Sequence, residues 1–244
     1  MPKYGVIIPS AGKGERFGGG EKKTLAKLDG RPVFLRTIEL FLNREDVCQV
    51  ILAVGMEDIA AIKSSYGANL GFMGVKLVEG GTRRCDSVAA ALKQLSEQAA
   101  YVAVHDAVRP CASHEEINAV FAEAVKSGAA ILATPITGTI KRVGESQVIE
   151  STESREGLYE AQTPQVFRRD IILSMYADPS KLSDDVTDDA QLAERAGHAV
   201  VVVASSPLNL KITTKADLAL AGAILKSRPA KAVPKLGAFE EAKW

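Results

Sequence analysis

The residues most suited to chemistry lie near the start of the chain, in the stretch Pro9 to Gly18 that follows the apolar run 4–8. This stretch holds Gly12, Gly14 and Arg16, and Lys23 comes shortly after it. Glycines let main-chain N–H groups approach phosphate oxygens, and Lys and Arg side chains offset phosphate charge. The pattern therefore predicts a polyphosphate-binding turn at the end of a buried strand.

Two common phosphate-binding loops do not fit this stretch. A Walker loop needs Gly-Lys-Ser/Thr after a glycine and four further residues, and no glycine here satisfies that spacing. The dinucleotide fingerprint needs a small residue three places after Gly14, where this chain has Phe17. The turn is therefore interpreted as a nucleotide site of another kind.

A second glycine turn, Gly80-Gly81, enters an expected helix whose first turn carries Arg84 and Ser87. Helix N-termini favour anions, and a serine there can also bond a base or a sugar. Taken alone, the segment is equally compatible with an ordinary helix start with an exposed arginine. It becomes a candidate site only in combination with the first turn.

An acid and a base stand three residues apart at Asp106 and Arg109, directly after an expected strand. Asp106 is suited to Mg²⁺, because hard oxygen ligands bind this ion at phosphate sites. The alternative is a structural Asp–Arg pair that closes a loop. His105 is interpreted as a strand-end residue rather than a catalytic base, since the chain has no G-x-S-x-G elbow.

Later segments add hydroxyl groups and a second lysine. Thr163 and Thr187 are expected near helix starts, where such residues alone are typical of turns and N-caps. Lys211 follows the last expected strand. Cleavage of a nucleoside triphosphate at its α-phosphorus needs cations, a metal ligand and a rigidly placed attacking oxygen. The segments supply such parts.

These side chains must be positioned by an alternation of short β-branched runs and helical patterns. The expected strands cover residues 4–8, 49–54, 75–78, 101–105, 129–133 and 199–203. Continuous apolar strands alternating with helices predict an α/β fold with a Rossmann-like, mostly parallel twisted sheet and helices on both faces. Ligands bind at the carboxyl ends of strands in such sheets. The first glycine turn and Asp106 fall at such ends.

Residues 136–160 interrupt the alternation with a polar segment rich in Thr, Gly and Glu. We interpret it as a β-arm that projects from the sheet and contacts a second copy in a homodimer. The alternative is a surface loop, since long loops in compact domains are often functional or disordered. Residues 1–227 are expected to form a single nucleotidyltransferase domain, and residues 228–244 a loosely ordered tail.

Composition excludes several other classes of protein. Among 244 residues, 30 basic and 30 acidic side chains give no net field that would attract nucleic acid or an anionic membrane. No apolar run approaches membrane-spanning length, and the N-terminus lacks a signal-peptide pattern. Three cysteines without a C-x-x-C pair indicate neither a disulfide framework nor a zinc site. We therefore expect a cytoplasmic protein.

Several motifs in a fixed order make the assignment more specific. They are P-x-A-G-x-G-x-R (9–16), G-G-x-x-R-x-D-S-V (80–88), H-D-A-x-R-P (105–110), T-P-Q-x-F (163–167), T-D-x-A (187–190) and N-x-K-I-T (209–213). Together they resemble the 2-C-methyl-D-erythritol 4-phosphate cytidylyltransferase family, from Pro9 to about Leu220. Each motif alone is weak, and their order and spacing carry the resemblance.

The resemblance implies a role for each matching residue. The nucleotide site would contain Pro9, Ala11, Gly12, Gly14, Gly81, Arg84 and Ser87, with Arg84 and Ser87 beside the cytidine of CTP. The catalytic cations would be Arg16, Lys23 and Lys211, and Asp106 would face Mg²⁺ or another divalent cation. The polyol phosphate pocket would contain Asp106, Arg109, Thr163 and Thr187, completed across the dimer by Thr139 and Arg155 of the arm. The substrate phosphate itself would attack, so no protein nucleophile is expected.

Some alternatives stay open at this point. A ribitol 5-phosphate cytidylyltransferase would share the nucleotide motifs and differ in the arm and around Arg109, Arg155 and Thr187. A UTP-dependent sugar nucleotidyltransferase lacks the second glycine turn, and a regulatory module without turnover would be expected to lose Lys23, Asp106 or Lys211.

Two departures from the family pattern leave single residues open. Lys22 stands where many family members have proline, so Lys22, Lys23 and Lys27 all remain candidates for the phosphate contact. Leu208 stands where some members have an acid, which leaves a second metal ligand open.

Overall fold

A seven-stranded sheet forms the centre of the protein in the computed structural model, which describes residues 1–11, 17, 22–178, 182–183 and 185–228. From edge to edge the strands are β11 (Val201–Ala204), β7 (Ala129–Pro135), β10 (Tyr159–Arg168), β6 (Tyr101–Val104), β1 (Tyr4–Pro9), β4 (Val47–Gly55) and β5 (Val75–Gly80). Only β10 runs antiparallel to its neighbours in this sheet. The predicted mostly parallel α/β sheet is confirmed.

Helices cover both faces of this sheet because its strands are largely apolar and point successive side chains to opposite faces. In β1, Val6 and Ile8 pack with the helices α1 (Val33–Glu39), α2 (Met56–Phe72) and α4 (His114–Ser127). Ile7 points to the opposite face, where α3 (Arg84–Leu92), α5 (Arg169–Met175) and α6 (Asp189–Arg195) pack. Successive strand residues face opposite sides, so continuous apolar strands need this double cover.

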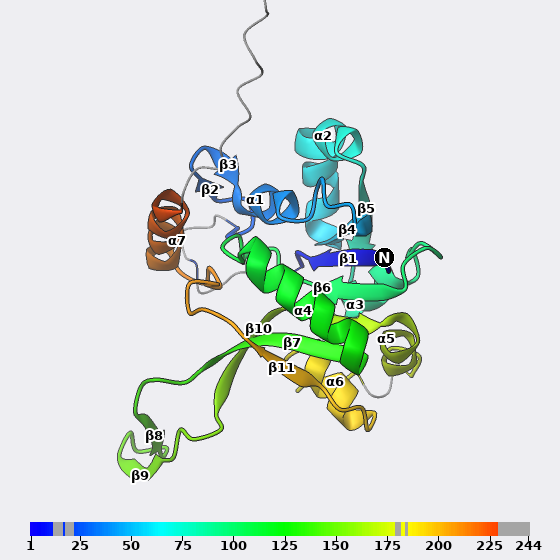
Figure 1. Cartoon of the computed structure of the whole chain (residues 1–244). Helices are drawn as coiled ribbons and strands as arrows, with labels where there is room; N and C mark the ends of the chain where they lie inside the picture. Colours follow the sequence, from blue (N-terminus) through cyan, green and yellow to red (C-terminus); the bar gives the residue numbers. More distant parts are fainter. Residues whose placement is uncertain (12–16, 18–21, 179–181, 184, 229–244) are drawn as a thin grey trace, which may run out of the picture.

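A smaller apolar cluster joins the two ends of the chain. Helix α7 (Lys215–Ser227) packs on the short strand β2 (Lys27–Leu28), which pairs with β3 (Arg31–Pro32); Figure 1 shows the three together. Ile212 is buried in this cluster, and its N–H donates to the carbonyl of Val108 at 2.9 Å. The contact brings the segment that carries Lys211 against the loop that follows β6.

Thr163 does not lie near a helix start, as the sequence suggested, but inside strand β10. The helix after this strand, α5, begins only at Arg169. Residues 162–164 stand opposite a single residue of β7, because Ala161 pairs with Ala133 and Gln165 with Ile131. Such irregularities bend a strand and redirect its side chains. The main chain here is held from outside the sheet, by the Asn209 side-chain N–H that donates to the carbonyl of Thr163 at 2.9 Å.

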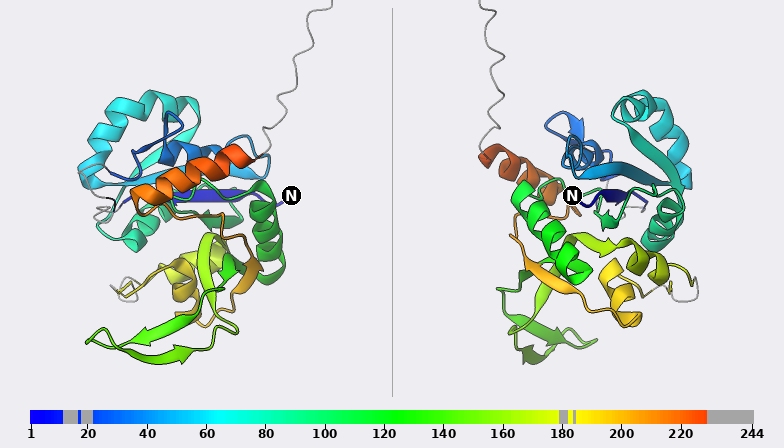
Figure 2. Two further views of the ribbon diagram at one scale, coloured as in Figure 1. Left: turned by 90° about the vertical axis from the view of Figure 1, so that its left-hand side faces the viewer. Right: turned by 45° about the vertical axis from the view of Figure 1, so that its right-hand side comes forward.

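The polar segment between β7 and β10 folds as a hairpin of β8 (Ile140–Val143) and β9 (Ile149–Glu153). It extends away from the body of the molecule, as Figures 1 and 2 show. The projecting β-arm expected from the sequence is therefore confirmed, whereas its contact with a second copy stays a prediction. In the described ranges, no helix combines the length and apolar character that a membrane crossing needs.

Candidate active site

Three adjoining cavities lie along the edge of the sheet where β1, β4, β5 and β6 end. We call them the glycine pocket, the central pocket and the outer pocket. The glycine and central pockets share Ala11, and the central and outer pockets share Arg84, Asp106 and Lys211. The three therefore lie next to one another in a row, at the edge where the parallel strands predict a ligand.

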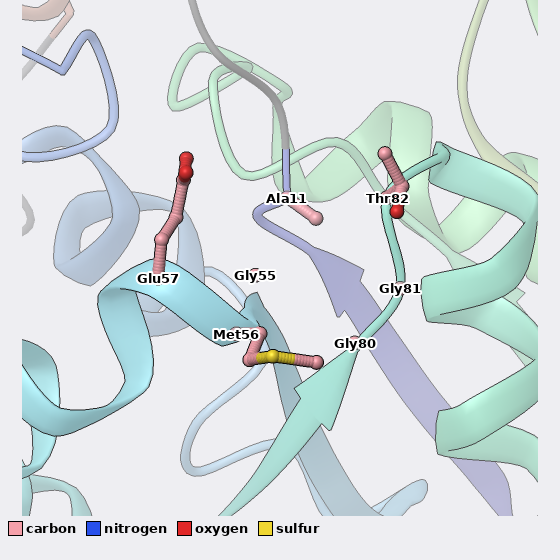
Figure 3. A pocket seen from close by; sticks show the side chains of 7 residues that line it. All are labelled: Ala11, Gly55, Met56, Glu57, Gly80, Gly81 and Thr82. Carbon is pink, nitrogen blue, oxygen red and sulfur yellow. The ribbon is translucent and has the colours of Figure 1, made fainter.

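Three glycines leave main chain exposed to the glycine pocket, beside the side chains of its other lining residues, as Figure 3 shows. Its lining residues are Ala11, Gly55, Met56, Glu57, Gly80, Gly81 and Thr82. A Cβ on Gly81 would lie 2.3 Å from the Cβ of Asp86, and one on Gly80 would lie 2.5 Å from the Oγ of Ser87. Both distances are too short for any side chain, so this turn requires glycine where the chain enters α3.

Ser87 stabilises this turn through its buried side chain. Its side chain is fully buried and is near enough to bond the carbonyl oxygens of Arg83, at 3.2 Å, and of Gly81, at 3.4 Å. It does not line the glycine pocket. Its predicted role beside the nucleotide stays a prediction, and the observed contacts assign the hydroxyl to holding the shape of the turn.

The central pocket gathers residues from both ends of the sequence. Its lining residues are Pro9, Ser10, Ala11, Lys23, Thr24, Arg84, Asp106, Ala107, Val108 and Lys211. The structure thus brings together Pro9, Ala11, Lys23 and Lys211, all predicted here from sequence. Gly12, Gly14 and Arg16 lie outside the described residues, and their predicted roles stay predictions.

The three candidate lysines are placed differently. Lys23 lines the central pocket. Lys22 points to α2, where its Nζ pairs with Glu57 at 2.8 Å and with Asp58 at 2.5 Å. Lys27 is exposed on β2. Of the three, only Lys23 is a lining residue of these cavities.

Asp106 is surrounded by three cations. Its carboxylate pairs with Lys211 Nζ at 2.8 Å and with Arg84 Nε at 3.0 Å, and Arg109 Nε lies 3.6 Å away. Burial opposes ionisation, but Arg84, Lys211 and Arg109 outweigh it and hold the pKa of Asp106 well below its usual range. Asp106 is therefore a permanently charged centre that fixes the positions of the cations around it.

Sequence reasoning missed the second carboxylate of this group, Asp189. It is completely buried, pairs with Arg84 Nη1 at 2.7 Å and accepts a hydrogen bond from the Tyr176 hydroxyl at 2.5 Å. Arg84 is thereby held between two carboxylates at the join of the central and outer pockets. We call Arg84, Asp106, Arg109, Asp189 and Lys211 the charged cluster. Asp189 occupies the variable position of the T-D-x-A motif. The only sequence feature that could have indicated it is an acidic residue in the first turn of α6.

Gln165 is a further residue that the sequence did not single out. Its Oε1 accepts from the main-chain N–H groups of Asp189 and Ala190, both at 3.0 Å, and its Nε2 donates to Asp188 at 2.8 Å. These contacts fix the start of α6 against β10. The glutamine of T-P-Q therefore places Asp189, and through it Arg84.

The outer pocket contains most of the residues predicted to bind the polyol phosphate. Its lining residues are Arg84, Asp106, Arg109, Ala161, Gln162, Thr163, Gln165, Thr187, Asp188 and Lys211. Arg109 is buried, and its guanidinium donates to the carbonyl of Asn209 at 2.7 Å. It can therefore serve the pocket through its charge while its guanidinium stays bonded to main chain.

Thr163 is bonded to the loop after β6. Its Oγ1 accepts from the Asp106 N–H at 3.1 Å and lies 3.0 Å from His105 Nδ1. His105 Nε2 lies 3.0 Å from the Arg109 carbonyl, which can only accept, so Nε2 carries the proton and the Thr163 hydroxyl donates to Nδ1. Burial lowers the pKa of His105 to about 4. This neutral, fully buried histidine is a strand-end residue that helps to place Asp106.

Of the residues predicted to bind the polyol phosphate, Thr139 and Arg155 do not line these cavities. Both are exposed on the arm, and the Arg155 guanidinium donates to the carbonyl of Thr137. Within one chain they do not complete the outer pocket. The role predicted for them across a dimer stays a prediction.

Among the carboxylates that line these cavities, Asp106 is the one placed to hold a divalent cation between the central and outer pockets. No three His, Cys, Asp or Glu side chains in the described residues gather as a metal-binding group. Mg²⁺ at phosphate sites uses one or two carboxylates, with phosphate oxygens and water as its other ligands. Asp106 lines both the central and the outer pocket and fits that arrangement. Leu208 is exposed and apolar and offers no second ligand.

An α/β sheet that carries a pocket lined by glycines beside a pocket lined by lysine and arginine side chains is the arrangement of a nucleotidyltransferase. Comparison with known proteins makes this specific. The model of the 2-C-methyl-D-erythritol 4-phosphate cytidylyltransferase family matches residues 5–227, and the chain belongs to this family. It is thus a CTP-dependent cytidylyltransferase, and the comparisons support this family rather than a ribitol phosphate enzyme.

Individual relatives agree with the family match. The 2-C-methyl-D-erythritol 4-phosphate cytidylyltransferase of Rhodopirellula baltica is 42% identical over 233 residues, covering 90% of this chain and 93% of its own. That of Alkaliphilus oremlandii is 37% identical and covers 93% and 97%. Among solved structures, the enzyme of Thermus thermophilus superposes with a TM-score of 0.76 at 28% identity, over 92% of this chain and 99% of its own.

Proposed function

We propose that this chain joins CTP to 2-C-methyl-D-erythritol 4-phosphate, giving 4-diphosphocytidyl-2-C-methyl-D-erythritol and pyrophosphate. A phosphate oxygen of the polyol would form a bond to the α-phosphorus of CTP as the bond to the bridging oxygen of the β-phosphate breaks. The observation that carries this proposal is the row of three cavities, with Lys23, Arg84 and Lys211 all lining the middle one.

The glycine pocket is the proposed site of the cytosine and ribose. Gly80, Gly81 and Thr82 offer main-chain groups there and no bulky side chain that would exclude a base. The pocket has the concave, partly apolar form that is typical of small-molecule sites. Its junction with the central pocket at Ala11 lets one nucleotide occupy both cavities.

The central pocket is the proposed site of the triphosphate. Lys23 and Lys211, together with Arg16, would offset the charge that develops on the α-phosphate. Arg84 lines both the central and the outer pocket, so it would face the α-phosphate of CTP and the phosphate of the polyol. A divalent cation, when bound, would neutralise triphosphate charge, and Asp106 would hold it. Because Arg84 and Lys211 are already held by the carboxylates of the charged cluster, these two side chains would need little reorganisation during the reaction.

The outer pocket is the proposed site of the polyol phosphate. Thr163, Thr187 and Arg109 line it, and hydroxyl groups suit a polyol that has several hydroxyls of its own. We infer a homodimer in which Thr139 and Arg155 of one arm reach this pocket in the partner. Exposed apolar side chains on and beside the arm support such a contact, namely Val143, Val148, Ile149, Leu158 and Tyr159.

We further infer that residues 1–227 act as one domain and that the reaction takes place in the cytoplasm, where CTP is made and used. Balanced charge and the lack of a membrane-length apolar run in the sequence support that location.

The test is pyrophosphate release from CTP and Mg²⁺ with 2-C-methyl-D-erythritol 4-phosphate, run beside ribitol 5-phosphate. A clear preference for the methylerythritol substrate supports the proposal. Preference for ribitol 5-phosphate would keep the CTP chemistry and reassign the second substrate. No turnover with either would contradict the enzymatic role.

A further inference from the structure

Lys22 forms a charged link between the turn at residues 22–26 and helix α2. Its Nζ donates to Glu57 Oε1 at 2.8 Å and to Asp58 Oδ1 at 2.5 Å. Both acids lie in the first turn of α2, directly after β4 ends at Gly55. The Lys22 side chain is 28% exposed and that of Asp58 only 15%, so this pair is better shielded from water than an ordinary surface ion pair.

The main chain of Lys22 is fixed at the same time. Its carbonyl oxygen accepts from the N–H groups of Leu25 at 2.8 Å and Ala26 at 3.1 Å, which closes a tight turn over residues 23–25. Lys23 and Thr24 of this turn line the central pocket. One residue therefore holds the turn with its main chain and α2 with its side chain.

Lys22 itself is not a lining residue of the three cavities. Glu57, by contrast, lines the glycine pocket. Burial opposes the charge of Lys22, but Asp58 and Glu57 outweigh it and raise the pKa of this amine. The lysine stays charged and engaged with α2, which leaves Lys23 as the lysine presented to the pocket.

We propose that Lys22 is a positioning residue that fixes the turn carrying Lys23 against the N-terminal turn of α2. This inference rests on the proposed function, because Lys23 matters only if a triphosphate occupies the central pocket. Lys22 directly precedes Lys23 of the central pocket and bonds Glu57 of the glycine pocket, so we expect the link to hold the proposed triphosphate and base sites in place relative to each other. Displacement of a catalytic group by about 1 Å can cost on the order of a hundredfold in rate, although the ion pair itself contributes little to stability.

The first variants remove each side of the link. Lys22→Ala is expected to lower kcat/KM for CTP by about tenfold, and Glu57→Gln/Asp58→Asn by a similar factor. The KM for the polyol phosphate should change little in both. The triple variant that combines Lys22→Ala with Glu57→Gln/Asp58→Asn should lose no more activity than either parent variant, because each parent already breaks the same link. Lys22→Arg keeps the charge and should stay within about twofold of the wild type.

Lys126→Ala is the matched control, since Lys126 forms an exposed ion pair with Glu123 on α4, outside the site. It should leave both substrates unaffected, and the melting temperature of every variant shows whether the fold is kept. If Glu57→Gln/Asp58→Asn improves CTP use while Lys22→Ala impairs it, Lys22 only screens acidic charge, and the positioning role is wrong. Normal CTP kinetics in Lys22→Ala would overturn the inference alone, whereas a wild-type protein without turnover would overturn the proposed function and this inference with it.

Discussion

The glycine pocket and the charged cluster lie side by side but are built in opposite ways. The first is shaped by main chain at the ends of neighbouring strands, and a single added methyl group at Gly81 would collide with Asp86. The second consists of charged side chains from α3, α6 and two loops, which hold one another by ion pairs. The difference teaches that the first region is sensitive to added volume and the second to lost charge.

The sharpest way to break this comparison is to remove the central charge of the cluster. Asp106→Asn would leave Lys211 and Arg109 without their carboxylate partner and Arg84 with Asp189 alone. We expect kcat to fall by about a thousandfold and the free energy of unfolding by about 3 kcal/mol. Steady-state kinetics and urea unfolding measure the two effects. Asp170→Asn, in an exposed pair with Arg168, is the control and should change neither.

Lys23→Ala removes a cation that lines the central pocket but is not part of the charged cluster. We expect kcat to fall by about a hundredfold with the fold unchanged. Lys27→Ala, which changes the exposed residue of β2, provides the comparison within the same segment. A near-normal rate for Lys23→Ala would move the phosphate contact to another lysine.

Gly81→Ala tests the other half of the comparison, because it adds volume and changes no charge. The new Cβ would displace Asp86 and the start of α3, so the KM for CTP should rise by about thirtyfold, with kcat less affected. Gly71→Ala in α2 is the matched control, since a Cβ there meets nothing within 4 Å. If Gly81→Ala bound CTP normally, the glycine pocket would not be the nucleotide site.

The arm extends the comparison to a third region. Arg155→Ala should raise the KM for the polyol phosphate by about tenfold and leave that for CTP unchanged, because one charge-assisted hydrogen bond is lost. Arg142→Ala, an arm residue paired with Glu153, should affect neither constant. A defect confined to CTP would show that the arm serves the nucleotide instead. Light scattering on both variants shows whether the dimer persists.

The smallest effect on catalysis concerns His105, whose role is structural. Burial lowers the pKa of His105 to about 4, below its ordinary value near 6.5. Its contribution to stability is therefore complete above pH 6.5 and is lost as the pH falls towards 4, by about 3 kcal/mol. Urea unfolding from pH 7 to pH 4 should show this slope, and His105→Gln should flatten it. An NMR titration midpoint near 6.5 for His105 would contradict the assignment.

The sequence predicted the parts of the site whose residues are close together in the chain. The glycine turn at Gly80-Gly81 and the pair Asp106 and Arg109 follow strands directly, so local pattern and strand order were enough to place them. The antiparallel strand β10 was not predicted, because Thr163-Pro164 has the composition of a turn, and residues 162–164 interrupt its pairing with β7. Contacts held by distant residues, such as Gln165 with the start of α6, have no local signal.

Asp189 shows the same limit in the charged cluster. It lies 105 residues from Arg84 in sequence, yet their side chains are 2.7 Å apart. The resemblance predicted that Arg84 lies beside the cytidine. In the structure, Arg84 lines the central and outer pockets and does not line the glycine pocket. Only the folded arrangement reveals that Arg84 lines two neighbouring cavities.

The most direct test of this account is a crystal structure of the protein with CTP and Mg²⁺. The account predicts the cytosine against Gly80, Gly81 and Thr82, with the triphosphate beside Lys23 and Lys211 and the outer pocket left for the second substrate. A cytosine bound between Thr163 and Thr187, or a triphosphate that does not approach Lys23, would contradict the division of the site into a main-chain pocket for the base and a charged pocket for the reacting phosphates.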